Sequence, residues 1–168
     1  MCVSEIMKRM IDFSEGNQHD IAHFLKVYTL AKTIGESEGL DEETQLVLEA
    51  AAITHDIACA LCREKYGNSD GPRQEWDYRR QVRLLLKDTG LTDCQIDRAS
   101  YVVGHLHAPG SVQGMDYQIL AEADYLANAD ENSYPISKIR SDKNTLFQTA
   151  SGISLLESIY FPQEKPES

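Results

Sequence analysis

Residues 49–58, Glu-Ala-Ala-Ala-Ile-Thr-His-Asp-Ile-Ala, constrain the fold of this chain more than any other segment. Their apolar residues recur at helical spacing, which predicts a helix with one face in the protein core. The adjacent residues His55 and Asp56 lie on that helix. A buried imidazole or carboxylate is costly unless something satisfies it, and a metal ion is a common partner. The run therefore predicts a helix that carries ionisable side chains into the protein interior.

Helical spacing of apolar residues continues along the chain, and no segment alternates as a strand would. We expect helices over residues 19–36, 41–58, 61–66, 74–88, 92–107, 115–130 and 145–160, with a short N-terminal helix and a short polar helix opened by Pro135. Asp41 is a candidate N-cap, residues 92–95 form a capping box, and residues 67–73 predict a loop. The predicted fold class is all-α, a compact bundle of six to eight helices with no sheet. It forms one domain over residues 1–168, with a charged tail from about residue 162.

Composition limits the partners that we expect. The chain has 16 lysine and arginine residues against 27 aspartate and glutamate residues, a formal charge of -11. A surface of that sign repels duplex nucleic acid and anionic membranes, so neither is expected as a partner. No stretch approaches the roughly 20 apolar residues that span a bilayer. The N-terminal residues resemble a helix rather than a signal peptide, so the expected location is cytoplasmic.

The four cysteines, at positions 2, 59, 62 and 94, are expected to be reduced thiols. Cys59-Ala-Leu-Cys62 matches the C-x-x-C pattern, but a redox site of this kind needs a βαβ context and a zinc site needs a second pair. Neither is visible, so a cysteine redox protein is a remote alternative. Packing as small apolar residues is the simpler interpretation.

Two further ionisable residues, His23 and Asp124, lie on apolar faces of other predicted helices. Each alone is explained by a satisfied polar network in the core. Together with His55 and Asp56 they would supply two imidazoles and two carboxylates. Such a set suits a divalent ion, with Mn, Fe, Co, Zn, Ni and Mg as candidates. His55 and Asp56 are about 100° apart around a helix, so both can reach an ion above the seam between them.

In this order, the four residues resemble the HD-domain metal-dependent phosphohydrolase superfamily, whose pattern is a His, a His-Asp doublet and a distant Asp, all on helices. The resemblance runs from about residue 15 to residue 160. More narrowly, the chain is similar to small stand-alone bacterial HD proteins through Gly104-His-Leu-His107 and Phe147-Gln-Thr-Ala-Ser-Gly152. The resemblance implies one HD-type helical domain with His23, His55, Asp56 and Asp124 as metal ligands. It also implies hydrolysis of a small phosphate ester by metal-activated water, with nucleotides among the candidate substrates.

The resemblance also suggests roles for neighbouring residues. Asp56 would orient or deprotonate the attacking water, and Glu75 is either a general acid or base or a solvated carboxylate at a helix start. Members with two ions carry a further histidine on the helix after the doublet, where this chain has Gln74 and Glu75. Whether a second ion binds is therefore open, and its available ligands are Glu75, His105 and His107.

Substrate contacts and assembly are less determined by the sequence. His105 and His107 are candidates for contacting phosphate, although their position at a helix end explains them equally well. Lys26, one turn after His23, is a further candidate. Residues 63–83 carry six basic and four acidic side chains, so this segment has a local positive charge. That charge would attract an anionic substrate, or the segment is simply a solvated face of the protein. His19 is expected to be solvated rather than a ligand.

A different class of function stays open. The missing second-metal histidine fits a non-catalytic metal- or nucleotide-binding module that signals through a partner. The choice between phosphomonoesters and phosphodiesters and the oligomeric state, including a homo-oligomer, are open too.

Overall fold

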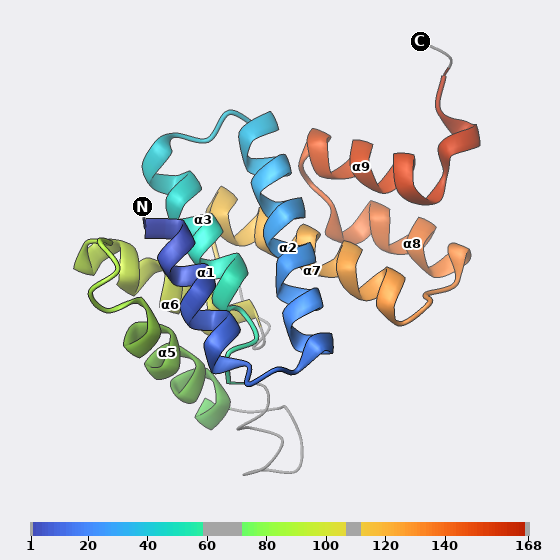
Figure 1. The fold of residues 1–168 in the computed structure, drawn as a ribbon. Helices are drawn as coiled ribbons and strands as arrows, with labels where there is room; N and C mark the ends of the chain where they lie inside the picture. Colours follow the sequence, from blue (N-terminus) through green and yellow to red (C-terminus); the bar gives the residue numbers. More distant parts are fainter. Residues whose placement is uncertain (1, 59–71, 107–111, 167–168) are drawn as a thin grey trace.

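The computed structural model describes residues 2–58, 72–106 and 112–166, and these form eight α-helices without any β-strand (Figure 1). This confirms the predicted all-α class. The elements are α1 (Cys2–Phe13), α2 (Gln18–Ser37), α3 (Glu42–Thr54), α5 (Pro72–Leu86), α6 (Asp93–Leu106), α7 (Met115–Glu131), α8 (Ile136–Leu146), α9 (Ala150–Tyr160) and the 3-10 helix η1 (Pro162–Glu164). The predictions made for residues 61–66, for residues 67–71 and for Cys59, Cys62 and His107 fall outside the described residues.

Helix α3 lies at the centre of the bundle, in contact with α1, α2, α6 and α7. Residues 47–54 are all buried. The run includes Glu49, whose carboxylate accepts hydrogen bonds from Tyr28, Lys32 and Gln45 at 3.1 to 3.2 Å. The end of this central helix therefore places His55 in the interior of the bundle, with the partly exposed Asp56 next to it.

Capping residues explain where several helices begin. The side chain of Asp41 accepts from the amide of Thr44 at 2.9 Å, which confirms the predicted N-cap of α3. The capping box before α6 is also confirmed, with Thr92 N–H donating to Gln95 Oε1 at 2.9 Å and Gln95 N–H to Thr92 Oγ1 at 3.2 Å. Gly39, with φ of 73°, follows α2 in the left-handed conformation that commonly ends a helix.

The predicted end of the helix that carries the His-Asp pair was wrong. α3 ends at Thr54, not near residue 58, and His55 is its C-cap. The ring of His55 turns back to the carbonyl oxygen of Ala52 at 2.7 Å, the oxygen that a continuing helix would bond to the amide of residue 56. The chain tightens instead, with the amide of Ile57 donating to Thr54 at 3.0 Å.

Two other boundaries differ from the prediction. Apolar spacing predicted one helix over residues 145–160, but α8 ends at Leu146 and α9 begins at Ala150. Thr149 separates them, because its side chain caps α9 by accepting from the amide of Gly152 at 2.9 Å. α5 runs over Pro72–Leu86 rather than residues 74–88, and a proline suits the first turn of a helix.

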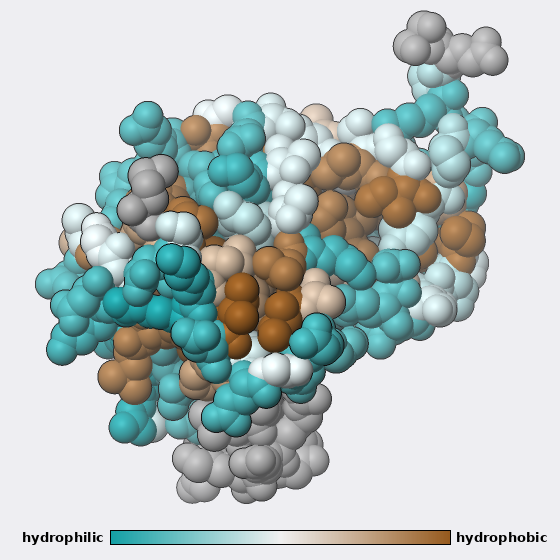
Figure 2. All heavy atoms as spheres, in the orientation of Figure 1, coloured by the Kyte–Doolittle hydropathy of each residue, from teal (hydrophilic) through white to brown (hydrophobic). Residues whose placement is uncertain are grey.

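The face of the molecule in Figure 2 is largely hydrophilic, as the acidic composition suggests. Apolar side chains gather over α9 and between α1 and α2. None of the helices formed by the described residues combines the length and the apolar character that crossing a bilayer requires.

Candidate metal centre

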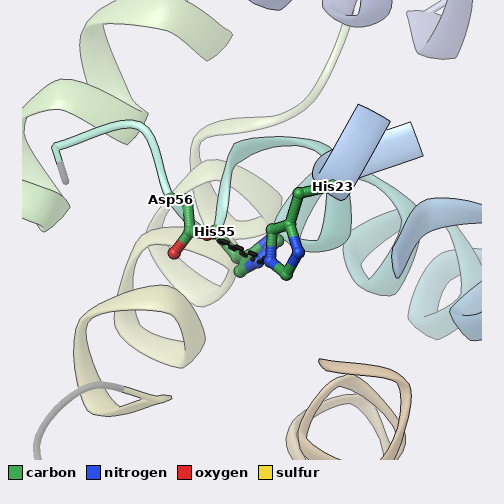
Figure 3. A group of neighbouring side chains, drawn as sticks. All are labelled: His23, His55 and Asp56. Atoms are coloured by element: carbon green, nitrogen blue, oxygen red, sulfur yellow. Dashed lines mark hydrogen bonds and ion pairs between the residues drawn. The ribbon is translucent and has the colours of Figure 1, made fainter. Parts of the chain in front are cut away.

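Three helical segments, far apart in the sequence, bring the predicted metal ligands together. His23 lies in the second turn of α2, His55 and Asp56 follow α3, and Asp124 lies in the middle of α7. α2 packs against both α3 and α7. Figure 3 shows the side chains of His23, His55 and Asp56 directed toward one another. Packing of these three helices therefore creates the site.

The distances between the ligand atoms suit a single ion. His23 Nε2 lies 3.0 Å from His55 Nε2 and 3.1 Å from Asp56 Oδ2. Asp124 Oδ1 lies 3.3 Å from Nε2 of each histidine, and Asp56 Oδ2 lies 3.3 Å from His55 Nε2. Ligands that bind one ion at about 2.1 Å and at right angles are themselves roughly 3.0 Å apart. Each aspartate therefore has the spacing of a neighbouring ligand to both histidines, and His23, His55 and Asp56 form a group whose ligand atoms all lie within 4.8 Å of one another. Among the described residues Asp124 adjoins this group through the two histidines rather than belonging to it.

Hydrogen bonds at the far side of each ring set the tautomers. His55 is fully buried, and its Nδ1 bonds to the carbonyl oxygen of Ala52 at 2.7 Å. His23 Nδ1 bonds to Glu131 Oε2, also at 2.7 Å. Because a carbonyl or a carboxylate oxygen can only accept, each Nδ1 carries the hydrogen. In the neutral rings both Nε2 lone pairs therefore face the two aspartates, an arrangement of four acceptors that only a cation or extra protons can satisfy.

The pKa values of the site residues also show that this site favours positive charge. Burial lowers the pKa of His23, but hydrogen bonds with Asp124 and Asp56 outweigh it and raise this pKa to about 10. The pKa of His55 is raised well above its usual value, since the two aspartates again outweigh burial. Burial raises the pKa of Asp124, but bonds from both histidines lower it to about 2. The metal-free site therefore holds protons where an ion would otherwise bind.

Metal binding should release protons over a wide pH range. His23 binds its proton below about pH 10, and a metal ligand must be a neutral imidazole. The apparent metal affinity should rise as pH increases from about 6.5 toward 10, and proton release should fade above pH 10. Calorimetry in buffers of different ionisation enthalpy measures the number released. A count near zero at pH 7.5 would contradict the described tautomers and charges.

Glu131 is the part of the site that the sequence did not predict. It lies seven residues after Asp124 on α7, two turns along the same helix face, and fixes the orientation of His23. Lys26, a candidate for contacting phosphate, pairs with Asp130 Oδ2 at 3.0 Å and with Glu131 Oε1 at 3.5 Å. Its spacing from Asp124 places Glu131 on the same face of α7, but its role follows only from its contact with His23.

Glu131→Gln should weaken metal binding by about 10- to 100-fold, the usual effect of losing a carboxylate that orients a histidine ligand. The amide can still accept at Nδ1, but it removes the negative charge that makes the ring a stronger ligand. Glu157→Gln, which changes a carboxylate paired with Lys143, is the matched control. Titration of metal-free protein with Mn²⁺ or Zn²⁺ gives the two dissociation constants, and equal values would remove Glu131 from the site.

The structure places the other candidate residues on α5 and α6. Glu75 Oε1 lies 3.5 Å from His105 Nδ1 and 3.8 Å from Arg79 Nη1, and His105 Nδ1 also bonds to the carbonyl of Tyr101 at 2.9 Å. Within the described ranges no third histidine, cysteine or carboxylate joins Glu75 and His105 in a possible metal-binding group. His19 is exposed at the start of α2, as expected.

An all-helical domain that brings two imidazoles and two carboxylates together is an arrangement suited to a metal-dependent hydrolase. The HD domain family matches residues 20–129, more than half of the chain, and this span contains His23, His55, Asp56 and Asp124. The chain therefore belongs to the HD-domain superfamily of metal-dependent phosphohydrolases. No curated protein and no solved structure shows significant similarity to it.

Proposed function

We propose that this protein is a metal-dependent phosphohydrolase that cleaves a small phosphate ester, with nucleotides among the candidate substrates. The observation that carries the proposal is the convergence of His23, His55, Asp56 and Asp124. The two histidine Nε2 atoms lie 3.0 Å apart, and each aspartate has an oxygen 3.1 to 3.3 Å from both of them. A divalent ion held there would lower the pKa of a bound water and offset charge on the phosphoryl oxygens.

The four side chains differ in their access to a substrate. His55 is fully buried and His23 is 8% exposed, so both serve to hold the ion. The side chain of Asp56 is 29% exposed, the largest value of the four. Asp56 is therefore the residue that can accept a proton from the attacking water while the P–O bond to the alcohol breaks. The alcohol and the phosphate product then leave, and from a monoester that product is inorganic phosphate.

The Glu75 and His105 pair is a second place for proton transfer in this proposal. Its two side chains face each other across α5 and α6, and each is between a fifth and a third exposed. Glu75 stays a candidate general acid or base in this proposal, and the leaving oxygen takes its proton from Asp56 or from solvent. Lys26 acts through Glu131 rather than on phosphate, because its ammonium group pairs with that carboxylate and with Asp130.

Hydrolysis of phosphate esters tests the function directly, followed as inorganic phosphate from monoesters and as released alcohol from diesters. Protein stripped by a chelator is reloaded with Mn²⁺, Fe²⁺, Co²⁺, Zn²⁺, Ni²⁺ or Mg²⁺ and offered phosphomonoesters and phosphodiesters. We expect at least one ion to raise turnover on the order of 100-fold over the metal-free protein. Absence of turnover on every ester by protein that demonstrably holds the ion would overturn the proposal.

A non-catalytic binding module is the competing function. It is favoured by residues 72–86 of α5, which contain no histidine that could hold a second ion. A nucleotide that raises the melting temperature of metal-loaded protein, and is recovered unchanged, would identify this alternative. The same samples serve both measurements.

A further inference from the structure

A cavity of about 380 Å³ adjoins the metal centre, because Asp124 belongs to both. This size falls near the lower end of small-molecule pockets, about 300 to 1,000 Å³. The cavity is bounded by α7, by the last residue of α6, by the end of α8 and by residues that precede and follow α8. A phosphate ester with its phosphorus at the ion can therefore place its alcohol part in this space.

The walls of the cavity suit a flat or apolar group. Tyr117, Tyr125 and Tyr134 contribute aromatic surface, and Leu106 and Leu146 contribute aliphatic surface. Tyr125 is held in place by its hydroxyl, which donates to Asp142 at 2.7 Å, and by edge contact with a phenylalanine ring. Uncharged amides complete the walls: Gln118, Asn128 and Gln148. Aromatic and amide groups recognise uncharged rings through stacking and hydrogen bonds.

The charge of the cavity excludes a second anionic group. Its charged residues are two carboxylates, Asp124 and Glu122, and no lysine or arginine is found among the described residues that line it. Glu122 is 1% exposed and accepts from the hydroxyl of Thr149 at 2.7 Å and from Gln118 at 2.8 Å. Lys138 lies over the ring of Tyr134, but its ammonium group pairs with Asp142.

Basic residues gather elsewhere, along α5. Arg79, Arg80, Arg83 and Lys87 line a larger hollow of about 1080 Å³ between α5 and α6. None of the four metal-centre residues lines that hollow. Two of its arginines are paired with acidic neighbours, since Arg83 contacts Asp97 at 2.9 Å and Arg79 contacts a glutamate at 3.8 Å. The cavity that shares Asp124 is therefore the better place for the alcohol part of a substrate.

We propose that the cavity beside Asp124 selects phosphate monoesters whose alcohol is uncharged and carries a flat ring, and rejects those with a second negative group. This inference rests on the proposed function for the position of the phosphate. It names the side chains that choose the substrate: the three tyrosines, the three amides and Glu122.

Two substrates of equal shape test the selection. 4-Carbamoylphenyl phosphate and 4-carboxyphenyl phosphate differ by one negative charge far from phosphorus. We expect kcat/KM to favour the carbamoyl ester by about tenfold or more, the effect of a like charge a few ångströms away in a partly screened pocket. 4-Carbamoylbenzylphosphonate and 4-carboxybenzylphosphonate have a P–C bond in place of the P–O bond and cannot be hydrolysed. Their dissociation constants therefore report the same preference without turnover.

Asn128→Lys adds a cation to the wall of the cavity. It should lower the ratio of kcat/KM values for the two esters, and the ratio of dissociation constants for the two phosphonates, by about tenfold, with metal content unchanged. Asn144→Lys, the same change at an exposed position of α8 that does not line the cavity, should leave both preferences as they were. If Asn128→Lys does not fold, Gln148→Lys makes the same test, because Gln148 is an exposed residue of the lining.

The outcomes separate the two proposals. Metal-dependent turnover with equal rates for both esters and no effect of Asn128→Lys overturns the cavity assignment alone. Selective binding of the carbamoyl phosphonate that Asn128→Lys reverses, without turnover of any ester, overturns the proposed hydrolase function and supports the cavity assignment. Equal binding of both phosphonates overturns the cavity assignment whether or not esters are cleaved.

Discussion

Asp56→Asn should abolish phosphate release, lowering kcat/KM on the order of 1,000-fold or more. The change keeps the shape of the side chain but removes the charge that lies 3.1 Å from His23 Nε2 and 3.3 Å from His55 Nε2. It removes a metal ligand and the candidate proton acceptor at once. Elemental analysis should show that bound metal falls together with activity.

The fold should survive this substitution, because the side chain of Asp56 is 29% exposed and lies after the end of α3. Circular dichroism should keep the helical signal. Asp12→Asn, the same change at an exposed position of α1, is the control and should retain metal and activity. An Asp56→Asn protein with a full complement of metal and activity within tenfold of the parent would remove Asp56 from the proposed chemistry.

Gly152→Ala should destabilise the protein by about 2 to 3 kcal/mol, although alanine normally favours a helix over glycine. A Cβ at this position would overlap Glu122 Oε1 and would lie 2.6 Å from Thr149 Oγ1. Glu122 is almost fully buried and accepts hydrogen bonds from Thr149 and Gln118, so displacing it breaks a satisfied network. For a chain of this size the melting temperature should fall by about 4 to 12 °C.

A double-mutant cycle isolates the cause. In a Glu122→Ala background the new methyl group has no carboxylate to displace, so Gly152→Ala should cost clearly less, and the remaining cost comes from Thr149 Oγ1 at 2.6 Å. Gly39→Ala is a useful contrast, because its φ of 73° introduces backbone strain without any side-chain overlap. If Gly152→Ala costs the same in both backgrounds, the contact with Glu122 is not the reason for the glycine.

This network explains the Phe-x-Thr-x-x-Gly segment that the sequence analysis noted. Phe147 meets the ring of Tyr125 edge to face with centroids 5.6 Å apart. Thr149 caps α9 and donates to Glu122, and Gly152 leaves room for that carboxylate. The segment thus attaches α9 to α7, the helix that carries Asp124, and supports one wall of the proposed substrate cavity.

The sequence could predict the features that depend on residues close together in the chain. Ionisable residues on apolar helix faces, such as His23 and Asp124, are visible because their neighbours at helical spacing are apolar. The caps Asp41 and Thr92 are visible because capping chemistry involves residues three apart. The structure brings these predicted ligands together, although their coordination of an ion stays a prediction.

The features that sequence could not predict depend on distant contacts. Glu131 has a role only because His23, 108 positions earlier in the chain, lies against it. The end of α3 at Thr54 depends on the orientation of the His55 ring, which residue spacing does not encode. By contrast, the break between α8 and α9 has a local cause, the cap at Thr149, which apolar periodicity alone overlooks.

The position of the site at the junction of α2, α3 and α7 has a thermodynamic consequence. An ion bound there would cross-link three helical segments that start at residues 18, 42 and 115. Only the folded chain brings its ligands together, so the ion would bind the folded state alone. Free metal at 100 times its dissociation constant would then add about 2.7 kcal/mol to the unfolding free energy. Melting curves recorded against metal concentration would thus report occupancy even before a substrate is known.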